Sequence, residues 1–171
     1  MKLKKKNLLK LIIYTILTFG CIITIFLFSA QNAEVSSRNS FGVLNAITEI
    51  ISDVFHVSVD KRQILSVHSI FRKMAHFSIY AVLAVFAYNM FRQLIEKKIR
   101  IFIVTFIFCV LTAISDEIHQ VFIPGRSAEV RDVLIDAFGV CVGLIFVWVG
   151  SILIKRRRQI KNNKIRVIKN V

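Results

Sequence analysis

Four long apolar stretches constrain this chain more than any other feature of its sequence. A helix needs about 20 mainly apolar residues to cross the hydrocarbon core of a bilayer. Four stretches of the 171-residue chain come close to or exceed this length, and they lie at Leu8–Phe28, Met74–Phe91, Ile101–Ile118 and Val133–Ile154. Their length and flanking charges separate them from the buried helices of a soluble protein, and the mean hydropathy of +0.65 agrees. We therefore expect an all-α membrane protein with four transmembrane helices.

The positively charged residues gather at the same ends of these stretches. Three segments, residues 2–10, 92–100 and 155–169, contain 17 of the 24 lysines and arginines. The other two connections, with the helix ends beside them, contain nine of the ten acidic residues, the exception being Glu96. The positive-inside rule assigns the three basic segments to the cytoplasm. We therefore expect a multi-pass protein of the cell membrane with both termini cytoplasmic.

The net charge of +14 does not by itself indicate a nucleic-acid-binding protein. Topology and attraction to anionic lipid account for the basic C-terminal residues, so we expect the lipid bilayer as a partner and no nucleic acid. We divide the chain into a transmembrane domain at 1–155 and a basic cytoplasmic tail at 156–171. The three cysteines lie inside the predicted spans without Cys-x-x-Cys spacing, so they offer no zinc site.

The connection between the first two spans is predicted to hold an extracytoplasmic amphipathic helix. It covers residues 29–71 and opens with a polar, turn-prone stretch. Apolar residues then recur at helical spacing from Val43 to Phe55, with polar residues on the other face and Ser40 as a candidate N-cap. This segment is too polar to span, so we expect it to lie along the outer interface or to pack on the bundle.

A stripe of polar residues is predicted to enter the membrane on the second span. A helix that starts near Asp60 places four polar residues on one face at intervals of four: His68, Arg72, His76 and Tyr80. Ionisable groups at this depth are costly unless they face the protein interior or water. A lone histidine in a span is more often a satisfied core residue, whereas four aligned polar groups favour a functional site.

The third span ends in a second group of polar residues at the outer level. Asp116 and Glu117 are adjacent there, and His119 and Gln120 follow them. Asp116 shares a helix face with His119 and Gln120 because residues three and four apart are neighbours on a helix. Spanning a membrane does not require two adjacent carboxylates, so we treat them as site candidates. The alternative interpretation is a polar collar at the membrane surface.

The last connection and the fourth span supply a third polar group. Pro124-Gly125 is a turn signal, and it presents Arg126 and Ser127 at the tip of the connection. Asp132 and Asp136 are four residues apart at the start of the fourth span and share a face. The same span carries a Gly-x-x-x-Gly pair, which predicts close helix packing.

Topology brings the three polar groups to one level, because the second and fourth spans run inward and the third runs outward. We expect them to meet around one pocket. The acid–base candidates are His76, Asp116, Glu117 and His119. The candidates for substrate binding are Arg72, Lys73, Tyr80, Gln120, Arg126, Ser127, Arg131, Asp132 and Asp136.

Several short motifs occur in a fixed order along the chain. They are Phe28-Ser29-Ala30-Gln31, Arg72-Lys73-Met74-Ala75-His76-Phe77 followed by Tyr80, Asp116-Glu117-Ile118-His119-Gln120, Ile123-Pro124-Gly125-Arg126-Ser127, and Arg131-Asp132-Val133-Leu134 with Gly139. With these motifs the chain resembles the VanZ-like family over roughly residues 8–152. The resemblance implies a multi-pass membrane protein linked to teicoplanin-type glycopeptide resistance. The family often has asparagine where this chain has Asp136, so the pocket carries an extra potential charge.

Two classes of function remain open at this point. In the first, the protein binds or shields a cell-envelope molecule at the outer leaflet and so lowers its access to an antibiotic. Four basic residues would hold a phosphate or carboxylate of a lipid-linked or anionic ligand, and they are Arg72, Lys73, Arg126 and Arg131. Arginine suits this role through its bidentate donors.

The alternative is a membrane-embedded enzyme that acts on a lipid-linked phosphate or a related envelope substrate. His76 or His119 would then exchange protons, because histidine titrates near neutral pH. Nearby carboxylates would orient the histidine or hold a divalent cation. Oxygen ligands alone favour Mg²⁺ or Ca²⁺, whereas an added histidine allows Zn²⁺ or Mn²⁺. No spacing is diagnostic, so the metal and any cofactor stay unassigned. A transporter fits less well, because the cytoplasmic half lacks a matching polar path.

Overall fold

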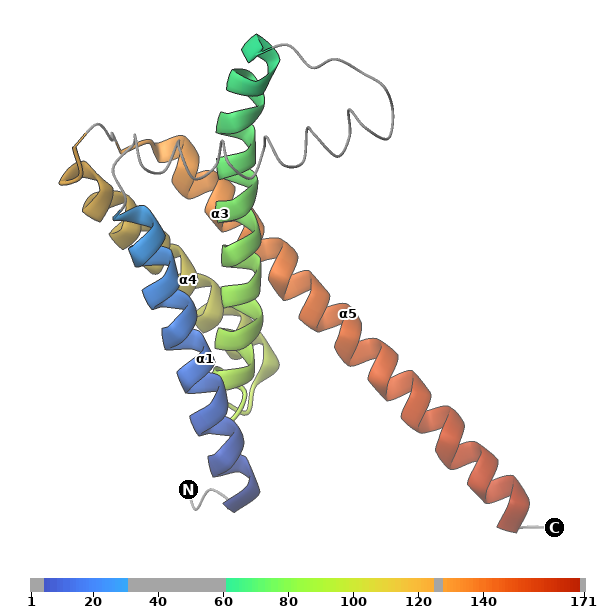
Figure 1. Ribbon diagram of the computed structural model, residues 1–171. Coiled ribbons are helices and arrows are strands. Elements are labelled where there is room, and N and C mark those ends of the chain that lie inside the picture. The colour runs from blue at the N-terminus through green and yellow to red at the C-terminus, as the bar shows by residue number, and fades with distance from the viewer. Residues whose placement is uncertain (1–4, 31–60, 125–127, 170–171) are drawn as a thin grey trace.

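All regular secondary structure in the described part of the chain is α-helix, as predicted, and no strand occurs there (Figure 1). The computed structural model describes residues 5–30, 61–124 and 128–169, with the side chains of 5–6, 61–72, 161 and 163–169 outside the description. The helices are α1 (Lys5–Ser29), α3 (Lys61–Phe91), α4 (Lys98–Val121) and α5 (Val130–Lys169). The predicted amphipathic helix at residues 40–55 lies outside the described residues.

Each helix contains a segment long and apolar enough to cross a membrane. These segments are Asn7–Ser29, Lys73–Phe91, Lys98–Val121 and Val130–Ile160, and each contains one of the four predicted spans. α3 begins at Lys61, which agrees with the predicted start near Asp60. α5 continues without a break past Ile154 to Lys169, so the proposed division at residue 155 falls inside one helix.

The helices alternate in direction along the chain (Figure 1). α1 and α4 run one way while α3 and α5 run the other, so both ends of the chain lie at the same end of the bundle. We call this the basic end, because Lys10, Arg92, Lys98 and Lys155 lie at it. The opposite end, where α1 and α4 finish and α5 starts, is called the polar end.

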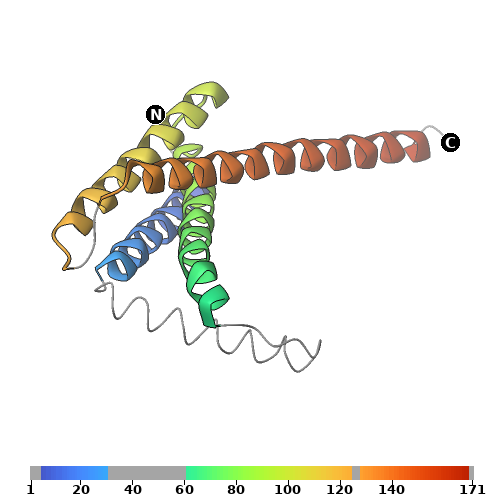
Figure 2. The same cartoon turned by 90° about the horizontal axis from the view of Figure 1, so that it is seen from above.

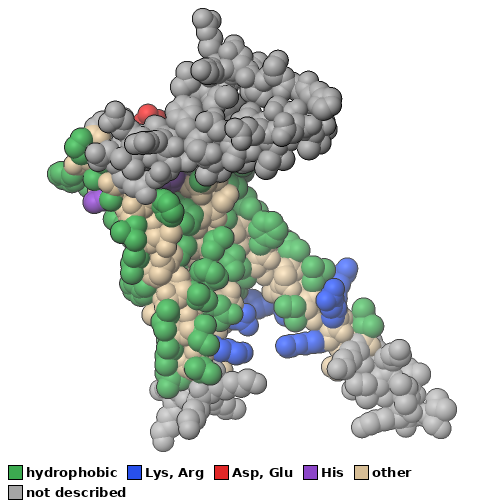
Figure 3. Space-filling view, viewed as in Figure 1, with side chains coloured by type: hydrophobic (Ala, Val, Ile, Leu, Met, Phe, Trp, Pro, Cys, Tyr) green, Lys and Arg blue, Asp and Glu red, His purple; other side chains and the backbone are tan. Residues whose placement is uncertain are grey.

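α3 is the central helix and contacts all three others. Its residues Tyr80, Leu83, Ala84 and Ala87 recur every three to four positions and are fully buried. They pack with Ile25 of α1, Cys109 and Ala113 of α4, and Val140 and Leu144 of α5. The opposite faces carry exposed leucine, isoleucine and phenylalanine side chains, which cover much of the surface in Figure 3. Such an apolar exterior suits contact with lipid and would be an aggregation hazard in water.

Two glycines set the contact between α3 and α5. A Cβ atom at Gly139 would lie 3.1 Å from the carbonyl carbon of Phe77, and one at Gly143 would lie 3.0 Å from that of Ala81. Each would come closer still to the carbonyl oxygen. The Gly-x-x-x-Gly pair is therefore used for close packing, and it fixes a parallel register in which each turn of α5 faces one turn of α3.

α5 stays close to the bundle only in its first half. Beyond this contact it diverges from the other helices toward the basic end, as Figure 1 shows and the view along the bundle in Figure 2 confirms. The divergence separates the C-terminal half of α5 from α1 and from the connection between α3 and α4.

Candidate functional site

The polar end gathers side chains from α1, α3, α4 and α5 that the apolar spans do not need. We call this set the polar cluster, and its described members are Ser29, Lys73, His76, Tyr80, Asp116, Glu117, His119, Gln120, Asp132 and Asp136. Asp116 is 1% exposed and Asp136 is 2% exposed, although both are carboxylic acids. The register set by the two glycines brings α3 and α5 together here, with His76 directly before the first glycine contact at Phe77 and Lys73 one turn before it.

One part of the cluster ties α1 to α4. The Ser29 hydroxyl donates a hydrogen bond of 2.7 Å to Oδ2 of Asp116. The Gln120 side-chain amide donates to the same carboxylate oxygen at 3.1 Å and lies 3.4 Å from the Ser29 hydroxyl. Ser29 was not among the predicted site residues. Its place at the outer end of the first span, inside the Phe28–Gln31 motif, is the signal that could have identified it.

A second part of the cluster holds the start of α5. The Glu117 carboxylate accepts a hydrogen bond of 2.8 Å from the backbone N–H of Glu129, one residue before α5 begins. A carboxylate at a helix N-terminus satisfies an otherwise unpaired N–H group and is favoured by the helix dipole. Glu117 therefore has a structural role in addition to its place beside the cavity described below.

A third part links α3 to α5 through charge. The Lys73 ammonium group lies 2.7 Å from Asp132 Oδ1 and 3.7 Å from Glu129 Oε2. The Lys73 and Asp132 side chains are 27% and 20% exposed, so water screens this pair only partly. Lys73, predicted to bind an anion, is therefore already paired with acids of this chain.

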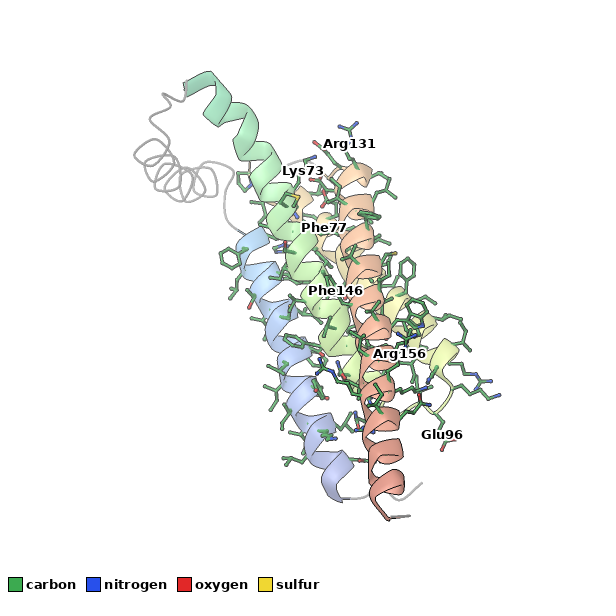
Figure 4. All side chains as sticks on the ribbon, turned by 90° about the vertical axis from the view of Figure 1, so that its right-hand side faces the viewer. Lys73, Phe77, Glu96, Arg131, Phe146 and Arg156 are labelled. Carbon is green, nitrogen blue, oxygen red and sulfur yellow. The ribbon has the colours of Figure 1, made fainter. Side chains whose placement is uncertain are left out.

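His76 and Asp136 face each other across the same helix contact. His76 Nδ1 lies 4.0 Å from Asp136 Oδ2, which makes an ion pair if the imidazole is protonated. Both line a cavity of about 10 Å³, together with Lys73, Glu117, Gln120, Asp132 and Ile135. A cavity of this size has room for one water-sized group. Figure 4 shows Lys73 and Arg131 at this end of α3 and α5.

Four buried polar atoms have no hydrogen-bond partner among the described residues. They are Tyr80 Oη, Asp116 Oδ1, His119 Nδ1 and Asp136 Oδ1. Burying such a group without a partner costs about 1–3 kcal/mol, and more if it is charged. Tyr80 is completely buried one turn below His76, in electrostatic range of Asp116 and Asp136. The ring of His119 packs on Phe26, with the ring centres 5.6 Å apart.

The remaining candidates lie at the edge of the described structure. Arg72 is on α3, but its side chain lies outside the described residues, and so do Arg126 and Ser127. Arg131 is exposed in the first turn of α5. No group of three or more His, Cys, Asp or Glu residues in the described ranges is arranged to hold a metal ion.

Carboxylates dominate the cavity, so its chemistry is mainly that of a hydrogen-bond acceptor. Asp136, Glu117 and Asp132 supply acceptor oxygens, while Lys73, His76 and the Gln120 amide supply donors. The arrangement suits a small group that donates a hydrogen bond, or a proton that moves between His76 and Asp136.

Comparison with known proteins identifies the family of the chain. No curated protein matches the sequence, and no solved structure matches it. Residues 11–154 match the VanZ/LLP1 family, and this region covers most or all of each of the four apolar segments and contains the described polar cluster. The chain belongs to the VanZ/LLP1 family.

Proposed function

We propose that this protein lies in the cell membrane with its basic end in the cytoplasm and binds a cell-envelope component at its polar end. The positive-inside distribution of lysine and arginine supports this orientation. The observation that carries the binding proposal is Asp136, a buried carboxylate beside a cavity, one oxygen of which has no partner among the described residues.

Structural roles account for three of the acids but not for Asp136. Asp116 joins α1 to α4, and Glu117 holds the start of α5. Asp132 pairs with Lys73 at the rim. Asp136 lies deeper than Asp132 by one turn, about 6 Å, and an ionisable group at such depth marks function by default.

The size and lining of the cavity indicate which chemical group of the ligand it would bind. It has room for a single hydroxyl or amino group, which would donate to the Asp136 carboxylate. The Lys73 and His76 side chains at its rim would face an acceptor oxygen of the same ligand. Arg72 and Arg126 are proposed to contact a phosphate or carboxylate farther out, because arginine forms bidentate pairs with such groups. The ligand is therefore proposed to be an envelope molecule with a hydroxyl or amine close to an anionic group.

The family link suggests the physiological outcome. We propose that occupancy of this site reduces access of a teicoplanin-type glycopeptide to its envelope target. Expression of the chain in a susceptible host should then raise the teicoplanin concentration needed to stop growth.

Substitution of Asp136 tests this proposal. Asp136→Leu removes the acceptor and should return susceptibility to that of the empty vector at equal membrane levels. Asp136→Asn keeps a hydrogen-bonding side chain and should retain part of the effect. Glu96→Gln, an exposed acid-to-amide change at the basic end, is the matched control and should change nothing. Wild-type protection by Asp136→Leu would refute the site.

Stability measurements separate a functional carboxylate from a structural one. Asp136→Leu replaces a buried acid, one oxygen of which has no partner among the described residues, with an apolar side chain of the same branching, so it should raise the free energy of unfolding by about 1–3 kcal/mol. A gain in stability with a loss of protection is the pattern expected of a binding residue. Loss of both would indicate that Asp136 supports the fold.

A second candidate function is a membrane enzyme acting on a lipid-linked phosphate. The pairing of His76 with Asp136 favours it, because a carboxylate beside an imidazole can orient it for proton transfer. His76→Gln keeps a hydrogen-bonding side chain but cannot shuttle a proton. Unchanged protection by this variant supports binding alone, and complete loss with wild-type protein levels supports catalysis.

A further inference from the structure

A large groove opens at the basic end, far from the polar cluster. Its volume is about 1180 Å³, and it lies between α5 and the connection that joins α3 to α4. It is the space left where α5 diverges from the bundle (Figure 1). Ligand pockets commonly measure about 300–1,000 Å³, so the groove has room for much of a lipid molecule. We call it the basic groove.

The walls of the basic groove are charged at one level and apolar at another. Four basic residues line it: Arg92, Lys98, Lys155 and Arg158. In Figure 3, lysine and arginine side chains occupy both sides of the gap between α5 and the bundle. Tyr88, Phe146 and Val147 supply an apolar wall nearer the middle of the helices, and Ile154 adds an apolar side chain beside Lys155. A charged rim above an apolar wall matches a molecule with an anionic head and a hydrocarbon tail.

Two of the basic side chains line the groove from different helices. Lys98 at the start of α4 and Lys155 on α5 are within electrostatic range of each other, although both normally carry positive charge. Like charges at such distances repel, and an anion between them would convert the repulsion into attraction. None of the four basic residues forms an ion pair with an acid in the described ranges. Glu96, the acid among the described lining residues, points away from the helices in Figure 4.

We propose that the basic groove binds one anionic phospholipid, with its phosphate between Lys98 and Lys155 and an acyl chain along Phe146 and Ile154. The charge complementarity of the rim selects a phosphate-bearing lipid over a zwitterionic one. The lipid fills the space between α5 and the bundle and so holds α5 at its angle. This site is separate from the polar cluster and stands or fails independently of the function proposed there.

Native mass spectrometry of the purified full-length protein tests the proposal. The probe is phosphatidylglycerol, titrated in neutral detergent, with phosphatidylcholine as the zwitterionic comparison. We expect one tightly retained phosphatidylglycerol per protein. Each lysine near an anionic headgroup contributes roughly a fivefold change in affinity. The double variant Lys98→Gln/Lys155→Gln should therefore weaken retention by roughly 25-fold.

Matched variants distinguish a site from general attraction to the basic tail. Arg156→Gln/Arg157→Gln also removes two positive charges, but from α5 residues that do not line the groove, and it should change retention less than twofold. Gly150→Leu keeps every charge and places a side chain in the groove, so it should also weaken retention. Gly20→Leu, where a new Cβ has nothing within 4 Å, is its control and should bind like the wild type.

Three results would overturn the proposal. Equal loss in the two double variants would mean that the lipid responds to net charge alone. Equal retention of phosphatidylcholine would remove the role of the lysine pair. A lipid-free dimer disrupted by Gly150→Leu would assign the groove to a second copy of this chain.

Discussion

Substitution of Gly139 by alanine should separate α3 from α5, although the change adds only one methyl group. A Cβ atom there would lie 3.1 Å from the carbonyl carbon of Phe77 and closer still to its oxygen. Ordinary carbon contacts need about 3.5–4.0 Å, so the helices must move apart by about 1 Å. The neighbouring atoms belong to the backbone of α3 and cannot rotate out of the way as a side chain can.

Two opposing effects set the change in the free energy of unfolding that Gly139→Ala causes. Overpacking of a well-packed contact costs about 1–3 kcal/mol. Alanine is favoured over glycine in a helix by about 1 kcal/mol, and this gain applies to any helical glycine. Gly150→Ala is therefore the matched control, because a Cβ at Gly150 has nothing within 4 Å. The gain is common to the two variants and cancels, so they should differ by the overpacking cost alone, about 1–3 kcal/mol.

Heating in detergent followed by size-exclusion chromatography measures the difference. For a chain of this size, 1 kcal/mol corresponds to about 2–4 °C in melting temperature. Gly139→Ala should therefore melt about 2–12 °C below Gly150→Ala, and the latter should match or exceed the wild type. A Gly139→Ala protein as stable as Gly150→Ala would show that the glycine contact does not hold α3 against α5.

Two further predictions concern the α1–α4 contact and the topology. Ser29→Ala removes the hydrogen bond to Asp116 and should lower stability by about 1–3 kcal/mol, because the acceptor is a buried carboxylate. Ser78→Ala, whose hydroxyl bonds only to its own helix at Met74, should change stability by less than about 0.5 kcal/mol, and equal effects would refute the role of Ser29. In a background without the three native cysteines, Ser127→Cys and Asn162→Cys should react with an impermeant thiol reagent from opposite sides of intact cells. Labelling of both from one side would contradict the orientation.

The sequence predicts the spans well, because hydropathy and flanking charge are local properties. The four segments, their alternation and the early start of α3 follow from these properties alone. Hydropathy also fixes depth, so it placed Asp116, Asp132 and Asp136 near one end of the bundle. The glycine spacing indicated a close contact, although it did not identify α3 as the partner.

The pairing of the polar side chains did not follow from the sequence. The depth of a residue in the membrane does not determine the direction in which its side chain points from the helix axis, nor which helices are in contact. Lys73 was expected to face a ligand, yet it pairs with Asp132 because the parallel register of α3 and α5 brings them together. The sequence does not identify Ser29 as a site residue, because a serine after an apolar run usually marks only the end of a helix. The divergence of α5, which creates the basic groove, has no counterpart in the hydropathy pattern.

The most direct test of the central claim is to identify what lies at the polar end in the living membrane. A photoreactive diazirine amino acid at Ile135, which lines the cavity, should capture a nearby molecule on illumination. The same amino acid at Ile145, which is 56% exposed on α5, reports ordinary lipid contacts. We predict that mass spectrometry finds an envelope precursor with a hydroxyl or amine beside an anionic group at position 135 and only bulk phospholipid at position 145. Identical phospholipid adducts at both positions would contradict the account.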